Sequence, residues 1–174
     1  MNKIAIIYWS GSGNTEAMAN AIKTGVDGAG VSCDLYFVSD FDVASINDYD
    51  GLILGCPAMG AEVLEECEFQ PVFDEMINSL NGKAVALFGS YGWGSGEWMT
   101  TWEEQVKETG ADLFENGLII NETPDEDGLN TCEDFGKRFA VIDILPMPKG
   151  RGFLDTNDTC LLKKQVLLYL SKEG

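Results

Sequence analysis

Five short apolar runs recur along the first 120 residues, each bounded by glycine, serine, aspartate or asparagine. They are KIAIIYW (3–9), CDLYFV (33–38), YDGLILGC (49–56), KAVALFGS (83–90) and FENGLII (114–120). Runs of this length with little polar alternation are typical of strands that are buried on both faces of a sheet. The pattern therefore predicts five buried strands.

Segments with helical character lie between these runs. They span Asn14–Ala29, Gln70–Leu80, Glu97–Thr109 and Asp125–Ala140, while Val43–Ile46 has room only for a short helical turn. Buried strands that alternate with helices predict a parallel sheet covered on both faces and built by right-handed crossovers. The expected fold class is α/β, a three-layer doubly wound five-stranded parallel sheet.

The alternation of strands and helices ends near Ala140. The stretch LPMPKGRG that follows is rich in proline and glycine, which indicates a turn or connecting segment, and 161–170 could form a short helix. A length of 174 residues also favours one domain. We therefore expect a single domain at residues 1–140 and a C-terminal extension of unknown role at residues 141–174.

The composition narrows the possible functions. Eleven Lys and Arg residues stand against 29 Asp and Glu residues, for a formal charge of −18, so polyanionic nucleic acid and membrane surfaces are not expected partners. The absence of histidine excludes His-dependent catalytic triads. Five cysteines without a CxxC pair or metal spacing predict buried, reduced thiols in a cytoplasmic protein, and no apolar run is long enough to span a membrane.

A glycine loop, SGSGNT, joins the first predicted strand to the first helix. Exposed N–H groups and the helix dipole favour a phosphate in this context. A Walker loop would need a lysine, and a dinucleotide fingerprint would need a third glycine where this chain has Glu16. A single monophosphate is the best match, and the alternative is a Ser/Gly turn that only leads into the helix through Asn14.

Two further loops follow the third and fourth predicted strands, GCPAMGAEVLEE and GSYGWGSGEW. The carboxyl ends of parallel strands line one crevice in a doubly wound sheet, so these loops are expected to lie near the phosphate loop. Trp93 lies between glycines in the second of them. Its indole either caps the core of the domain or provides a plate on which a flat ligand stacks.

Together the three loops resemble those of flavodoxins, specifically the short-chain kind from anaerobic bacteria, over residues 1 to about 140. The resemblance implies the strand order 2-1-3-4-5 and a non-covalently bound FMN cofactor. It also implies a low-potential one-electron carrier, not an enzyme, that cycles mainly between semiquinone and hydroquinone. An FMN-dependent NAD(P)H:quinone-type oxidoreductase is the alternative, although no long insertion builds a substrate pocket.

The resemblance assigns residues to the cofactor site and implies no catalytic residue and no metal ligand. Trp93 would stack on one face of the flavin ring and Met59 would lie against the other, while Glu62 would accept a hydrogen bond from ring N3–H. The peptide after Gly60 would turn over on reduction. The full set of expected FMN-binding residues is Ser10, Gly11, Ser12, Gly13, Asn14, Thr15, Pro57, Ala58, Met59, Gly60, Ala61, Glu62, Ser90, Tyr91, Gly92, Trp93, Gly94 and Gly96.

Partners are expected to be redox proteins, such as reductases and iron–sulfur enzymes, that dock on an acidic face. The candidates for this face are Glu62, Glu65, Glu66 and Glu68. The alternative for each of them is a solvated run of charges at the start of a helix. The carrier itself is expected to be a monomer.

Overall fold

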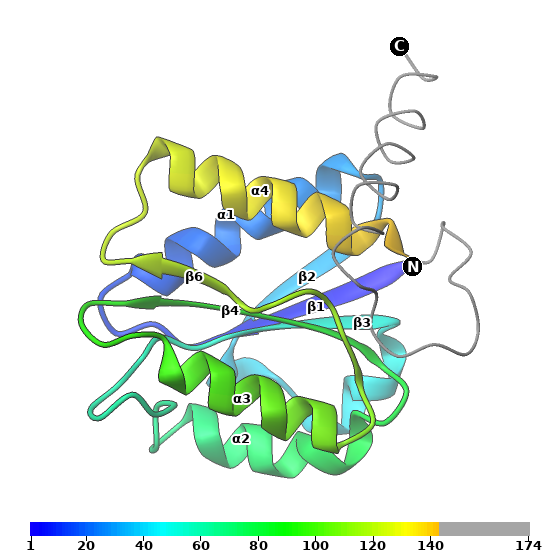
Figure 1. Cartoon of the computed structure of the whole chain (residues 1–174). Coiled ribbons are helices and arrows are strands. Elements are labelled where there is room, and N and C mark those ends of the chain that lie inside the picture. Colours follow the sequence, from blue (N-terminus) through cyan, green and yellow to red (C-terminus); the bar gives the residue numbers. More distant parts are fainter. Residues whose placement is uncertain (143–174) are drawn as a thin grey trace, which may run out of the picture. The chain divides into compact units, whose positions relative to one another are not determined.

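Six strands form one sheet in the computed structural model, which describes residues 1–142 (Figure 1). The strands are β1 (Lys3–Tyr8), β2 (Ser32–Phe37), β3 (Gly51–Gly55), β4 (Ala84–Tyr91), β5 (Asp112–Leu113) and β6 (Leu118–Asn121). Every pairing is parallel, in the order β2-β1-β3-β4-β5, and β6 also pairs with β4. The predicted parallel sheet and its strand order are confirmed.

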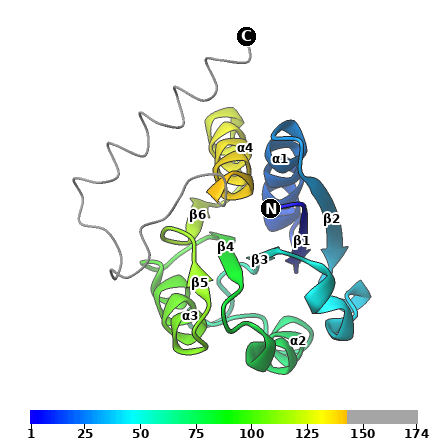
Figure 2. The same cartoon turned by 90° about the vertical axis from the view of Figure 1, so that its right-hand side faces the viewer.

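Helices cover both faces of this sheet. They are α1 (Asn14–Gly28), α2 (Phe69–Met76), α3 (Glu97–Glu108) and α4 (Glu126–Ala140), with 3₁₀ turns η1 (Val38–Asp40), η2 (Val43–Asp48) and η3 (Ile77–Ser79). Helices α1 and α4 lie on one face of the sheet, and α2 and α3 lie on the other (Figures 1 and 2). The three-layer arrangement and the short helical turn near Val43 are therefore as predicted.

The apolar runs supply two cores, one on each face of the sheet. In β1, Ile4 and Ile6 pack with α1 and α4, whereas Ala5 and Ile7 pack with α2 and α3. Successive side chains of a strand point to opposite faces, so a strand covered on both sides must be apolar at every position. This requirement explains why the runs show no polar alternation.

The prediction of a single fifth strand at 114–120 is wrong. Two short segments, β5 and β6, occupy this side of the sheet, and both pair with β4. Between them Glu115 has left-handed backbone with φ of 50°, and the Gly117 N–H donates to Glu103 Oε1 at 2.7 Å. A Cβ on Gly117 would lie 2.2 Å from the sulfur of Met99. The chain therefore packs against α3 at this point, and its backbone leaves the strand conformation.

The cysteines largely follow their prediction. Cys33, Cys56 and Cys132 are buried and free, and burial raises the pKa of each of these thiols to about 12. Cys67 is free but exposed, so the prediction of a buried thiol is wrong there. Cys160, like the predicted helix at 161–170 and most of the expected extension, lies outside the described residues. No helix within residues 1–142 is long and apolar enough to cross a membrane.

Candidate cofactor site

A pocket of about 360 Å³ lies at the carboxyl ends of β1, β3, β4 and β6. These strands are parallel, so the loops that leave them meet at one edge of the sheet. The residues that line the pocket are Trp9, Gly11, Ser12, Asn14, Pro57, Ala58, Met59, Ser90, Tyr91, Gly92 and Glu122. The fold thus brings residues of all three predicted loops to one cavity, and adds Trp9 and Glu122.

The remaining predicted residues belong to the same three loops but do not line this cavity. They are Ser10, Gly13, Thr15, Gly60, Ala61, Glu62, Trp93, Gly94 and Gly96. Trp93 is the most exposed large apolar side chain of the described residues, with 68% of its surface accessible. An indole this exposed does not cap the core, and its role as a stacking surface stays a prediction.

The phosphate loop ends at an uncapped helix start. Gly13 is the N-cap of α1 with φ of 90°, and no side chain within the described chain accepts hydrogen bonds from the first turn. A Cβ on Gly13 would meet no atom within 4 Å. Nearby, Ser10 Oγ accepts from the Gly13 N–H at 3.0 Å, and the buried hydroxyls of Thr15 and Ser90 share a hydrogen bond of 3.0 Å.

These donors suit an anion. The unpaired N–H groups of the first turn carry the positive end of the helix dipole. Open space at Gly13 lets an oxygen approach the backbone closely, and the serine and threonine hydroxyls add neutral donors. The residues present therefore fit a phosphate group without the help of a lysine or arginine.

The loop after β3 forms a tight turn. Met59 and Val63 exchange two backbone hydrogen bonds, of 2.9 and 3.0 Å. Within the turn Gly60 and Glu62 both have positive φ, 47° and 54°. Glycine adopts this conformation at no steric cost, which explains its place at the head of the turn.

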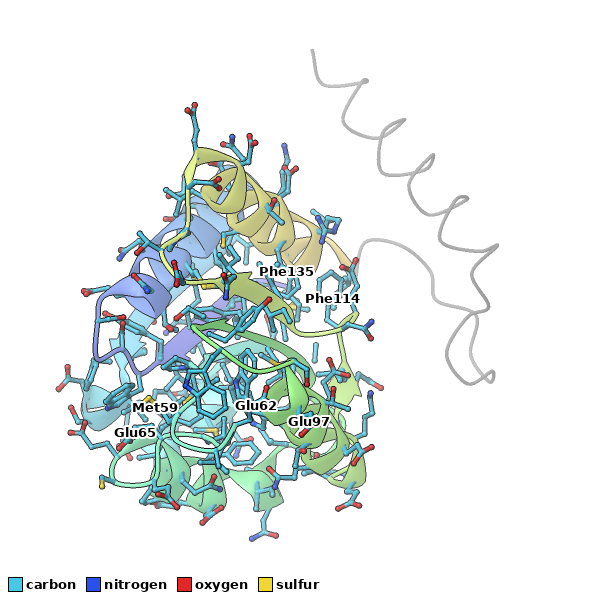
Figure 3. All side chains as sticks on the ribbon, turned by 60° about the vertical axis from the view of Figure 1, so that its left-hand side comes forward. Met59, Glu62, Glu65, Glu97, Phe114 and Phe135 are labelled. Atoms are coloured by element: carbon cyan, nitrogen blue, oxygen red, sulfur yellow. The ribbon has the colours of Figure 1, made fainter. Side chains whose placement is uncertain are left out.

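Glu62 connects this turn to the loop after β4. Its Oε1 accepts from the backbone N–H groups of Ser95, Gly96 and Glu97, at 3.1, 2.7 and 2.9 Å. Figure 3 shows Glu62 beside Glu97 at the start of α3. A Cβ on Gly94 would lie 2.5 Å from the carboxyl carbon of Glu62. A glycine is therefore required there, and one carboxylate holds two of the pocket loops together.

Glu65 holds the start of α2 in the same way. Only 8% of its surface is exposed, and it accepts from the backbone N–H groups of Cys67, Glu68 and Phe69 at 2.9, 2.8 and 2.9 Å. Burial by itself would raise the pKa of this carboxyl, but the three N–H donors outweigh burial and lower it. The prediction that Glu65 belongs to an acidic docking face is wrong, because the side chain points inward to cap a helix.

Replacing Glu65 with Gln is expected to reduce the free energy of unfolding at pH 7 by about 1 kcal/mol, since hydrogen bonds to a charged acceptor exceed neutral ones by about that amount. A folded-state pKa below the unfolded value of about 4.3 stabilises the fold above that pH. The difference between wild type and Glu65→Gln should therefore shrink as the pH falls through the folded-state pKa. Urea unfolding at pH 7 and at low pH measures it. Exposed Glu66→Gln is the control, and a pH-independent difference would contradict the prediction.

Trp9 is a pocket residue that the sequence reasoning missed. Its indole N–H donates to Glu68 Oε2 at 2.6 Å, and its ring lies so close to Gly11 that a Cβ there would be 2.7 Å away. The available signal was an aromatic residue at the end of a buried strand, directly before a glycine loop. The indole thus covers the phosphate loop and ties it to the chain before α2.

The loop after β6 also contributes to the pocket, as a fourth loop beside the three that the sequence predicted. The Asn121 side-chain N–H group donates to the carbonyls of Tyr91 and Gly92, both at 3.1 Å. The Glu122 N–H donates to the Tyr91 carbonyl at 2.7 Å, and the Thr123 hydroxyl donates to Asn14 Oδ1 at 3.2 Å. These bonds join the loop after β4 to the phosphate loop. The one signal for this segment in the sequence was its place directly after a predicted strand.

The chain is similar to a family model, to curated proteins and to solved structures. The family model described as Flavodoxin matches residues 6–136. A flavodoxin from Clostridium beijerinckii is 47% identical over 79% of this chain and 99% of its own length, and one from Megasphaera elsdenii is 44% identical over 79% and 98%. The solution structure of the two-electron reduced Megasphaera elsdenii protein is similar, with a TM-score of 0.73 over 79% of this chain and 98% of that one.

Proposed function

We infer the function of this chain from the fact that it belongs to the flavodoxin family: it is an FMN-binding electron carrier. The observation that carries the assignment of the site is a single pocket where three loops and an uncapped helix start meet. FMN, when bound, supplies the one-electron redox chemistry. The quinone reductase considered as the alternative is not favoured by these relatives. We further propose that the chain has no substrate of its own.

The phosphate of FMN would be held at the start of α1. Backbone N–H groups of the SGSGNT loop and the hydroxyls of Ser10, Ser12 and Thr15 supply neutral donors there. Because no lysine or arginine within residues 1–142 lines the pocket, no basic side chain of this part of the chain would neutralise the phosphate charge. The site would thus anchor FMN while keeping a negative field around it, which favours donation of electrons to a partner.

The flavin ring would lie between the loops after β3 and β4. Met59 lines the pocket from one loop, and its thioether is suited to an aromatic surface. Trp93 offers an exposed indole from the other loop. Glu62 fixes the spacing of the two loops through its bonds at the start of α3. We also propose, as the sequence suggested, that the carrier works mainly between its two reduced forms.

Redox proteins with a basic face are the proposed partners. Glu66 and Glu68 are exposed beside the pocket loops, and the chain carries a formal charge of −18. Attraction between opposite charges speeds encounter and is screened by salt. Free, buried cysteines support a reducing compartment such as the cytoplasm. Electron exchange with such a partner should slow as the salt concentration rises, and exchange that is independent of salt would contradict this docking mode.

An anaerobic reductive titration of the protein with added FMN tests the proposed function. The expected result is one FMN bound per chain and two separate one-electron steps in the visible spectrum. A protein that FMN cannot reconstitute would overturn the proposal. Rapid turnover of NAD(P)H with a quinone would support the reductase instead.

A further inference from the structure

Glu122 occupies an unusual backbone position at the wall of the pocket. Its φ is 53°, in the left-handed region that disfavours side chains with a Cβ. The bond from its N–H to the Tyr91 carbonyl and the bonds of Asn121 and Thr123 on either side hold it there. Strained backbone that is maintained by its surroundings is concentrated at functional sites.

Among the described residues that line the pocket, Glu122 is the only one with a charged side chain. Within residues 1–142 its carboxylate has no hydrogen-bond or ion-pair partner. By contrast, the carboxylates of Glu62 and Glu65 are each compensated by three backbone N–H donors. Glu122 is therefore an exposed carboxylate at the wall of the pocket that no donor within residues 1–142 compensates, on backbone that carries a conformational cost.

We propose that Glu122 is a potential-determining residue, whose carboxylate makes the bound flavin harder to reduce and a stronger electron donor. This inference rests on the proposed function. An electron that is not accompanied by a proton adds negative charge to the flavin, and a nearby carboxylate disfavours that charge. At about 10 Å and an effective dielectric constant of about 40–80, the affinity for the more negative form would fall about two- to fourfold.

The test is potentiometry of the FMN-reconstituted Glu122→Gln variant. The more negative of the two one-electron potentials is expected to rise by about 18–36 mV, the two- to fourfold change converted at about 59 mV per tenfold. The shift should diminish at high salt because the charge is partly exposed to solvent. Glu122→Asp retains the charge and should stay close to wild type.

Glu115→Gln is the matched control. Glu115 is also an exposed glutamate in left-handed backbone, with φ of 50°, but it pairs with Arg138 and does not line the pocket. Its neutralisation should leave both potentials unchanged. An equal shift in Glu115→Gln and Glu122→Gln would mean that only the net charge matters, and would overturn the proposal.

Glu122→Asn separates the charge from the backbone strain, since asparagine tolerates the left-handed region. It should raise the potential as Glu122→Gln does. Altered stability or altered affinity for oxidised FMN with unchanged potentials in both variants would show a structural or ligand-holding role only, and would overturn the inference. In that case the wild type still binds FMN and titrates in two steps. If the wild type does not bind FMN, the proposed function and this inference both fail.

Discussion

Replacing Gly136 with alanine is expected to destabilise the domain by about 3 kcal/mol, the upper part of the usual range for overpacking. A Cβ at this position would lie 2.1 Å from the backbone oxygen of Ile22 in α1. On the facing helix, a Cβ at Gly25 would lie 1.9 Å from the backbone oxygen of Glu133. Backbone atoms cannot rotate away as a side chain can, so the two helices must separate along the contact shown in Figure 2.

Urea unfolding of apoprotein variants measures this effect, and Gly28→Ala provides the control. Gly28 is the last residue of the same helix, α1, and a Cβ there would meet no atom within 4 Å. That variant should be neutral or more stable by up to about 1 kcal/mol, because alanine lowers the entropy of the unfolded chain. Wild-type stability in Gly136→Ala would contradict the close approach of α1 and α4.

The contact also concerns the site, because α1 begins at the phosphate loop. Separation of α1 from α4 would tilt the helix start that holds the proposed phosphate. Substitution of both Gly25 and Gly136 should cost less than the sum of the single changes, since the second Cβ enters a gap that the first has opened. FMN affinity of the single variants is expected to fall together with their stability.

Replacing Trp93 with alanine is expected to weaken FMN binding about five- to 150-fold, which corresponds to about 1–3 kcal/mol of lost aromatic stacking. The stability of the apoprotein should change little, because the indole is largely exposed and leaves no cavity behind. Measuring both FMN affinity and apoprotein stability therefore distinguishes a role of Trp93 in FMN binding from a role in the core.

Titration calorimetry with FMN measures the affinity, and Trp93→Phe should lie between wild type and alanine because it retains a smaller ring. Trp98→Phe provides the contrast. Trp98 is buried in the core and donates its N–H to the Cys56 carbonyl at 3.3 Å, so that variant should lose stability. Unchanged FMN affinity in Trp93→Ala would refute the stacking role.

Local pattern predicts most of the sheet for a physical reason. Strands buried on both faces must be apolar at successive positions, and the helices between them need one apolar face. Both patterns can therefore be recognised from residues that are close together in the sequence. The order 2-1-3-4-5 came from resemblance to a family and not from periodicity. The break between β5 and β6 could not be predicted from the apolar run, because it depends on the contacts of Gly117 with α3.

The sequence by itself determined the α/β class, and it predicted the three loops of the proposed site and a phosphate at a helix start without a basic side chain. Each depends on residues adjacent in the chain. Only the tertiary structure decided which of Glu62, Glu65 and Glu122 are compensated by N–H donors and which is not. Glu65 turns inward to cap α2, Glu62 reaches α3, and Glu122 lines the pocket from a loop far along the chain. The formal charge of a glutamate is the same at every position of a sequence. Its electrostatic free energy depends on the dipoles and the solvent that the fold places around it.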